Sequence, residues 1–236
     1  MTTAGNTPPK TPLWQVIFSI FYPLIFPTAL FWLANTFHWW EGWVFTVIFC
    51  GFVYFILIYL HLKDPALLQE RWTVRFQKDQ AEWDKIIIVM ISLSFFVWFV
   101  IIPLDSVRYK WSPEFPLSVK IAAIPVMIFS LFLFYDALKQ NTFAAPIVRI
   151  MEERNQKVIS SGTYGIIRHP MYCGGILLFI SGAALLGSLY GLIVAFLFIF
   201  IIAIRCIGEE NLLKQNLQGY EEYMKKVKWR LVPFIF

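Results

Sequence analysis

The chain has 236 residues, of which 58% are hydrophobic, 19% aromatic and only 15% charged. A typical soluble domain carries about 25% charged residues, so this composition excludes an ordinary soluble protein. The net charge of +5 does not by itself indicate nucleic-acid binding, because cytoplasmic membrane faces are also basic. The three cysteines have no metal-ligand spacing. We therefore predict neither nucleic acid nor metal among the partners.

Long apolar runs alternate with polar segments from the N-terminus onward. A membrane-spanning helix needs about 20 apolar residues. Four runs approach this length, at residues 14–35, 43–62, 86–104 and 117–138. These runs predict four membrane spans in the first part of the chain.

A fifth apolar run, residues 174–204, is too long for one span and contains no charged residue. Gly187 and Ser188 interrupt it, which predicts two short helices, 171–186 and 190–206, joined by a tight turn. The chain is thus predicted to be all-α: a polytopic membrane helix bundle with about six spans, including a C-terminal helical hairpin.

The basic residues predict how the bundle is oriented. If the N-terminus is cytoplasmic, all but three of the 20 lysines and arginines fall in cytoplasmic segments. The exceptions are Arg108, Lys110 and Lys120. Because basic residues accumulate on the cytoplasmic side, we predict that both termini are cytoplasmic. The membrane would be the cytoplasmic membrane of a prokaryote or the endoplasmic reticulum of a eukaryote.

Residues 63–85, between the second and third spans, interleave aromatic and apolar residues with charged ones. This pattern is typical of a helix that lies in the membrane interface. We predict a structural role for it and no chemistry.

A polar segment directly before the hairpin, residues 160–175, reads SSGTYGIIRHPMYCGG. Pro170 suits the first position of a helix, which would place Arg168 and His169 at the helix start. The free N–H groups and partial positive charge of a helix N-terminus bind anions. The segment predicts a carboxylate or phosphate site at the membrane surface; the alternative is an arginine and a histidine that merely mark the membrane boundary.

The end of the last span carries a second group of charges. Arg205 and Glu209 are four residues apart and share a helix face. They form either an ordinary helix-end ion pair or a functional site, because charges at membrane level tend to be functional. Residues 220–227 then read as an amphipathic helix. We divide the chain into an N-terminal membrane bundle, 1–138, and a catalytic region, 139–236.

Two linked motifs resemble the isoprenylcysteine carboxyl methyltransferases and their prokaryotic relatives. The first is G-x-Y-x-x-x-R-H-P-x-Y-x-G at 162–174. The second is R-x-x-x-E-E at 205–210, followed by G-Y-x-x-Y at 219–223 and R-L-V-P at 230–233. The resemblance covers about residues 140–236 and implies an integral membrane methyltransferase. Such an enzyme binds S-adenosylmethionine in cytosolic segments and methylates a lipophilic or prenylated substrate that enters from the membrane lipid.

The resemblance also implies roles for individual residues. Arg205 and Glu209 are the predicted catalytic residues. The Arg205 guanidinium would clamp a carboxylate acceptor, and Glu209 would orient Arg205. The helix start at Arg168 suits the cofactor's carboxylate, and an aromatic face suits its sulfonium. The predicted cofactor-binding residues are Val158, Ile159, Gly162, Tyr164, Arg168, His169, Tyr172 and Glu210.

Several functions stay open beside the preferred one, methyl transfer to a carboxylate such as a prenylcysteine-like group. A thiol and a phospholipid amine are the alternative acceptors. A sterol-type membrane reductase that uses NADPH is a second alternative, although the pair Glu209–Glu210 is unfavourable for its 2′-phosphate. A non-catalytic membrane protein is the third alternative. Few charged residues lie within the predicted spans, so a transport path is poorly supported. The sequence specifies no oligomeric state.

Overall fold

A computed structural model describes residues 13–72, 80–151 and 154–236, with side chains placed from residue 18 onward. Within these ranges the chain is helical, and its β contact is an isolated bridge between Ile167 and Trp229. The elements are α1 (Leu13–Ala34), α2 (Trp40–Lys63), α3 (Pro65–Trp72), α4 (Glu82–Pro103), η1 (Leu104–Arg108), α5 (Leu117–Gln140), η3 (Gly162–Gly165), α6 (Pro170–Leu186), α7 (Leu189–Asn216) and α8 (Tyr220–Lys226).

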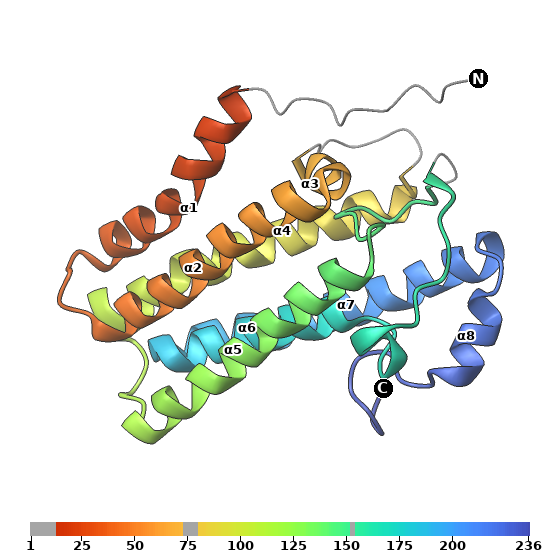
Figure 1. The fold of residues 1–236 in the computed structure, drawn as a ribbon. Coiled ribbons are helices and arrows are strands. Elements are labelled where there is room, and N and C mark those ends of the chain that lie inside the picture. The colour runs from red at the N-terminus through yellow and green to blue at the C-terminus, as the bar shows by residue number, and fades with distance from the viewer. Residues whose placement is uncertain (1–12, 73–79, 152–153) are drawn as a thin grey trace.

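The long helices lie side by side as a bundle (Figure 1). In the described chain, α2, α5, α7 and the segment Glu82–Arg108 are long and apolar enough to cross a membrane. Two shorter apolar helices, Phe18–Ala34 and α6, accompany them. The predicted all-α membrane bundle is therefore confirmed. The four long and two shorter apolar helices agree with the predicted number of about six spans. The division at residue 138 stays a prediction.

The predicted C-terminal hairpin is present, and its turn has the expected chemistry. Gly187 ends α6 in the left-handed conformation, with φ of 76°, which glycine adopts without strain. Ser188 then caps α7 by accepting a hydrogen bond from the Gly191 N–H at 2.8 Å.

The second helix of the hairpin is longer than predicted. It continues past residue 206 to Asn216, so that α7 has 28 residues and extends about 42 Å at 1.5 Å per residue. The extra turns contain good helix formers, such as Glu209, Leu213 and Lys214, and no glycine or proline after Gly208. A single rigid helix therefore joins the membrane bundle to the polar C-terminal region.

Both polar regions that carry the motifs lie at one end of the bundle. Figure 1 shows residues 141–151, residues 154–169 and α8 together at this end, with α3 nearby, and the hairpin turn at the opposite end. The interfacial helix predicted over 63–85 appears in part, as the end of α2 and α3; Arg75, Phe76 and Lys78 lie outside the described residues. The N-terminal bundle thus reaches the motif-bearing end of the molecule.

The opposite end of the bundle is tied together by a buried carboxylate. Asp105, in the η1 turn after α4, is fully buried and accepts hydrogen bonds from the Ser112 N–H at 2.7 Å and the Ser188 hydroxyl at 2.6 Å. It therefore holds the hairpin turn against the end of α4, far along the bundle from the motifs. Nearby, Glu41 of α2 forms an ion pair with Lys120 of α5.

Candidate active site

A cavity lies among the motif-bearing segments and α8. It holds about 850 Å³ of empty space, counted out to its solvent-open mouth. Its walls come from residues 141–149, residues 156–172 and the facing sides of α7 and α8. The lining residues are Asn141, Phe143, Ala144, Ala145, Ile147, Val148, Arg149, Gln156, Lys157, Val158, Ile159, Tyr164, Arg168, His169, Met171, Tyr172, Glu209, Leu213, Leu217, Tyr220 and Tyr223.

The tight turn at Gly162 is held by the end of α5. Asp136 accepts hydrogen bonds from both the N–H and the hydroxyl of Thr163, each at 2.7 Å. Gly162 has φ of 57°, and a Cβ atom there would lie 2.6 Å from the Asp136 Oδ2 atom. The turn therefore needs glycine both for its backbone conformation and for the close approach of Asp136. Gly162 shapes the wall but does not line the cavity.

Tyr164, two residues on, presents its ring to the cavity. Its hydroxyl accepts a hydrogen bond from the Asn141 side chain at 3.2 Å, and its carbonyl accepts one from the Tyr223 hydroxyl at 2.7 Å. Burial raises the pKa of the Tyr164 hydroxyl above its ordinary value of 10, and burial raises the pKa of Tyr223 likewise. Both phenols therefore stay neutral at physiological pH and cannot act as general bases.

Glu210 links the two motifs through three cationic or ionisable partners. Its Oε1 atom accepts a hydrogen bond from the Arg168 Nε at 2.7 Å and lies 3.2 Å from the His169 Nε2. Its Oε2 atom accepts one from the Arg230 Nε at 2.8 Å. The Glu210 side chain is 3% exposed, and Arg168 also donates to the carbonyl oxygens of Val227 and Lys228. Glu210 is consequently satisfied by the protein itself and does not line the cavity, although the sequence predicted it there.

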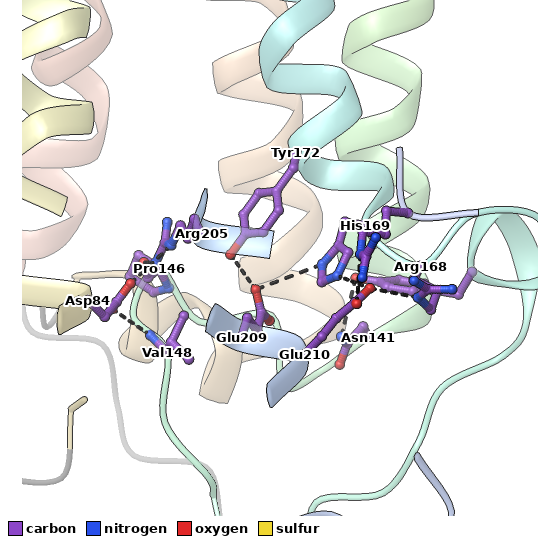
Figure 2. Close-up of polar contacts among 12 residues, drawn as sticks. Asp84, Asn141, Pro146, Val148, Arg168, His169, Tyr172, Arg205, Glu209 and Glu210 are labelled. Atoms are coloured by element: carbon purple, nitrogen blue, oxygen red, sulfur yellow. Dashed lines mark hydrogen bonds and ion pairs between the residues drawn. The ribbon is translucent and has the colours of Figure 1, made fainter. Parts of the chain in front are cut away.

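Glu209, its neighbour in sequence, faces the cavity. Its carboxylate accepts a hydrogen bond from the Tyr172 hydroxyl at 2.5 Å. The Tyr172 ring stacks on the His169 ring, with centroids 5.3 Å apart and an angle of 8° between the planes. Figure 2 shows Tyr172 reaching from α6 toward Glu209 on α7. A carboxylate, a phenol and an imidazole therefore converge at the inner end of the cavity.

Arg205 lies beside this cluster but has a different partner from the one predicted. Its Nε atom donates to Asp84 at 3.1 Å and its Nη2 atom to the Pro146 carbonyl at 2.7 Å (Figure 2). Its guanidinium carbon lies 5.4 Å from the centroid of the Tyr172 ring. The structure thus corrects the predicted pairing of Arg205 with Glu209. Arg205 pairs with Asp84 at the start of α4, and Glu209 binds the hydroxyl of Tyr172.

The N-terminal part of the chain also supports the cavity wall at residues 142–149. Asp84 accepts a hydrogen bond from the Val148 N–H at 2.8 Å. From the α2–α3 junction and α3, Asp64 accepts one from the Thr142 hydroxyl, and Arg71 donates to the Ala144 carbonyl at 3.0 Å. These contacts join residues that are 64 to 78 positions apart in sequence. No local pattern signals them, which is why the sequence predicted only a structural surface helix here.

The predicted site residues therefore divide into two groups. Those that line the cavity are Val158, Ile159, Tyr164, Arg168, His169, Tyr172 and Glu209. Gly162, Arg205 and Glu210 support it from behind. The sequence analysis missed Asp84 and Asp136, and it placed Asn141 only within the region of resemblance, without a role in the site. Asn141 and Asp136 stand next to the first motif in space, and Asp84 is a buried charge at the start of an apolar helix, which is a signal that could have singled it out.

The cavity lining offers the kinds of groups that the predicted cofactor, S-adenosylmethionine, would need. Aromatic rings from Tyr164 and Tyr172 suit a sulfonium, and the carboxylate of Glu209 suits an ammonium or a hydroxyl. Among the described residues no group of three or more histidines, cysteines, aspartates or glutamates could hold a metal ion.

A family model and a solved structure give matches to this chain, and the family model points to methyl transfer. Residues 119–219 match the family model described as phospholipid methyltransferase. The chain is also similar to a solved structure of a eukaryotic intramembrane Ras methyltransferase, isoprenylcysteine carboxyl methyltransferase. That similarity has 17% sequence identity and a TM-score of 0.47, over 95% of this chain and 88% of the other. No curated protein sequence gives a significant match. The matched segment 119–219 contains most of α5, the first motif and the pair Glu209–Glu210, and it confirms the resemblance to methyltransferases that these motifs predict.

Proposed function

We propose that this protein transfers a methyl group from S-adenosylmethionine to a lipophilic acceptor at the membrane surface. One observation carries the proposal: a single cavity, at one end of a bundle of apolar helices, is lined by residues of both motifs. The cavity opens to solvent, from which a water-soluble cofactor would enter. An acceptor with a lipid tail would approach from the surrounding membrane.

The cofactor would supply an electrophilic methyl group, which the acceptor removes by in-line displacement. This reaction depends mainly on positioning and on the exclusion of water. Tyr164 and Tyr172 would offer aromatic faces to the sulfonium. Val158 and Ile159 would bring backbone groups to the opposite wall, and Glu209 would hold a polar group through the hydrogen bonds of its carboxylate.

For the acceptor we propose first a carboxylate, such as a prenylcysteine-like group. A carboxylate attacks without losing a proton, so it needs a cation that orients it and no general base. Arg205 does not line the cavity itself, but it is buried beside the ring of Tyr172, which does, and its planar guanidinium would serve as that cation.

A phospholipid amine is the second candidate, and a specific observation favours it. Glu209 lines the cavity, whereas Arg205 does not. An amine is protonated at neutral pH and must lose a proton before it attacks, and a carboxylate within the cavity can attract it and accept that proton. The second alternative from the sequence, an NADPH-dependent reductase, is opposed by the same carboxylate, which would repel a phosphate.

The test is a pair of measurements on one detergent-purified preparation. Calorimetric titration with S-adenosylhomocysteine and with NADPH identifies the cofactor class. Transfer of a labelled methyl group is then measured to a farnesylated cysteine, to its carboxyl amide and to phosphatidylethanolamine. We expect binding of S-adenosylhomocysteine and labelling of the farnesylated cysteine but not of its amide. Labelling of phosphatidylethanolamine alone would replace the carboxylate with the amine, and NADPH binding without S-adenosylhomocysteine binding would refute the methyltransferase.

A further inference from the structure

Asp84 is a buried carboxylate to which the sequence motifs assign no role. It lies in the first turn of α4, outside the segment that matches the phospholipid methyltransferase model, and its side chain is fully buried. A buried charge is costly unless it is paired and fully hydrogen-bonded. The partners of Asp84 therefore decide whether its burial is compensated.

Both carboxylate oxygens of Asp84 are used, each toward a different part of the site. Oδ1 accepts from the Arg205 Nε at 3.1 Å. Oδ2 accepts from the Val148 N–H at 2.8 Å and from the Gln80 side chain at 2.9 Å. Asp84 thus joins α7 to the cavity wall at residue 148, and Gln80 secures it from its own segment.

Close packing of α4 on α7 brings these groups within reach. Trp83, next to Asp84, lies against Gly208, one turn after Arg205 on α7. A Cβ atom at residue 208 would lie 2.6 Å from the Trp83 ring, so only glycine admits this approach without a shift. The two helices therefore meet where the ion pair forms.

The ion pair in turn orients two groups at the inner end of the cavity. Arg205 also donates to the Pro146 carbonyl at 2.7 Å, so residues 146 and 148 are held from α7 and α4 together. On its other side the guanidinium lies over the Tyr172 ring, whose hydroxyl binds Glu209. A displacement at Asp84 would consequently reach Arg205, Tyr172 and the wall at once.

We propose that Asp84 is a positioning residue of the methyl-transfer site, through which the N-terminal membrane bundle holds Arg205 and the wall at Val148 in place. This role rests on the proposed methyltransferase function. Asp84 does not line the cavity, so it acts on the reaction only through these two contacts.

The experiment compares Asp84→Asn with a matched control, Asp105→Asn. Both aspartates are fully buried, both accept several hydrogen bonds, and Asp105 lies at the opposite end of the bundle. Misplacement of a catalytic group by about 1 Å can cost roughly a hundredfold in rate. We expect Asp84→Asn to lower kcat by about this factor per folded molecule, and Asp105→Asn to leave kcat unchanged. Hydrogen exchange of the peptide that contains residues 144–149 should accelerate in Asp84→Asn only.

A double variant separates positioning from general loss of structure. Because one of the two contacts of Asp84 is with Arg205, the kcat loss of Asp84→Asn combined with Arg205→Met should be smaller than the product of the two single losses. Independent roles would instead multiply the two losses. The double variant also removes both charges of the pair, which buried sites tolerate better than the loss of one, so it provides a folded protein if Asp84→Asn does not.

The outcomes distinguish this role from the proposed function. If the wild-type protein methylates an acceptor and Asp84→Asn matches Asp105→Asn in kcat and in exchange, Asp84 has no positioning role. Losses that multiply in the double variant would likewise overturn it. A wild-type protein that transfers no methyl group to any acceptor overturns the proposed function, and the role of Asp84 with it.

Discussion

Adjacent carboxylates on α7 take on separate tasks. Successive residues of a helix point about 100° apart. Glu209 therefore faces the cavity and Tyr172, while Glu210 faces the segments that carry Arg168 and Arg230. The sequence analysis predicted Glu210 as a cofactor-binding residue, and in the structure it joins the two motifs without lining the cavity.

Removal of the Glu210 charge should destabilise the fold. Glu210→Gln leaves Arg168 and Arg230 without their shared anion, and the loss of one partner of a buried ion pair costs about 3–5 kcal/mol. We expect a fall in unfolding free energy toward the lower end of this range, because Arg230 is 32% exposed. Denaturant unfolding in detergent measures it. The control is Glu222→Gln on the exposed side of α8, which should change the free energy by less than about 0.5 kcal/mol. Equal effects of the two variants would contradict the role of Glu210.

Arg205 should matter for turnover more than for cofactor binding. Arg205→Lys keeps the charge next to Asp84 but loses the planar fork that also reaches the Pro146 carbonyl. We expect S-adenosylhomocysteine affinity to change little and turnover to fall about 10²–10³-fold, the usual worth of a transition-state clamp. Methyl transfer and cofactor titration are measured on the same preparation. Near-normal turnover would make Arg205 a membrane anchor, and an equal loss of cofactor affinity would assign it to the cofactor.

At the scale of elements, the turn η3 and the start of α6 determine the positions of the residues of the first motif. The turn η3 is held at the end of α5 by Asp136, and after four intervening residues α6 begins at Pro170. The helix start at Pro170 was predicted as an anion site. In the structure, the Arg168 side chain donates hydrogen bonds to Glu210 and to the carbonyl oxygens of residues 227 and 228. Groups of the protein itself therefore already bind the Arg168 guanidinium.

The η3 turn provides a test at this scale. Gly162→Ala introduces a Cβ atom 2.6 Å from the Asp136 Oδ2 and 2.7 Å from the Gln140 Nε2, at φ of 57°. The strain, about 1–3 kcal/mol, should displace Tyr164 and weaken S-adenosylhomocysteine binding by a similar free energy. The control is Gly51→Ala on α2, where the added Cβ meets no atom within 4 Å. It should leave binding unchanged, and Gly162→Ala binding as well as this control would show that the turn does not shape the site.

At the scale of the whole molecule, one end of the bundle collects the cavity, α3 and α8, and the other is closed by Asp105 and the hairpin turn (Figure 1). A multi-pass membrane protein follows from the apolar helices. Arg71 of α3 and Asp84 of α4 hold the cavity wall at residues 144 and 148, and both belong to the N-terminal bundle. We therefore expect this bundle to be needed for the site as well as for anchoring.

The orientation in the membrane is the prediction at this scale. We expect both termini and residues 139–170 on the cytoplasmic side, with residues 106–116 on the other, because the basic residues gather at the cytoplasmic end. Single cysteines at residues 114 and 222, in a background without the native cysteines, can be labelled from one side with an impermeant reagent. We expect opposite labelling of the two positions, and labelling from the same side would refute the topology.

The sequence by itself determined the elements, because their causes are local. Hydrophobic runs of sufficient length form spans, Gly187 and Ser188 make a hairpin turn, and Pro170 begins a helix. The sequence analysis also predicted seven of the 21 residues that line the cavity, among them Val158, Tyr164, His169, Tyr172 and Glu209.

Only the tertiary structure decided which charges pair. Arg205 has a suitable carboxylate four residues away in Glu209, yet it binds Asp84, which is 121 residues distant in sequence. The choice depends on the packing of Trp83 against Gly208, which brings α4 to α7, and on the hydrogen bond of Glu209 with Tyr172. Local sequence sets helix faces and turn conformations, but the partner of a buried charge is whichever opposite charge the packing of distant helices brings within hydrogen-bond distance.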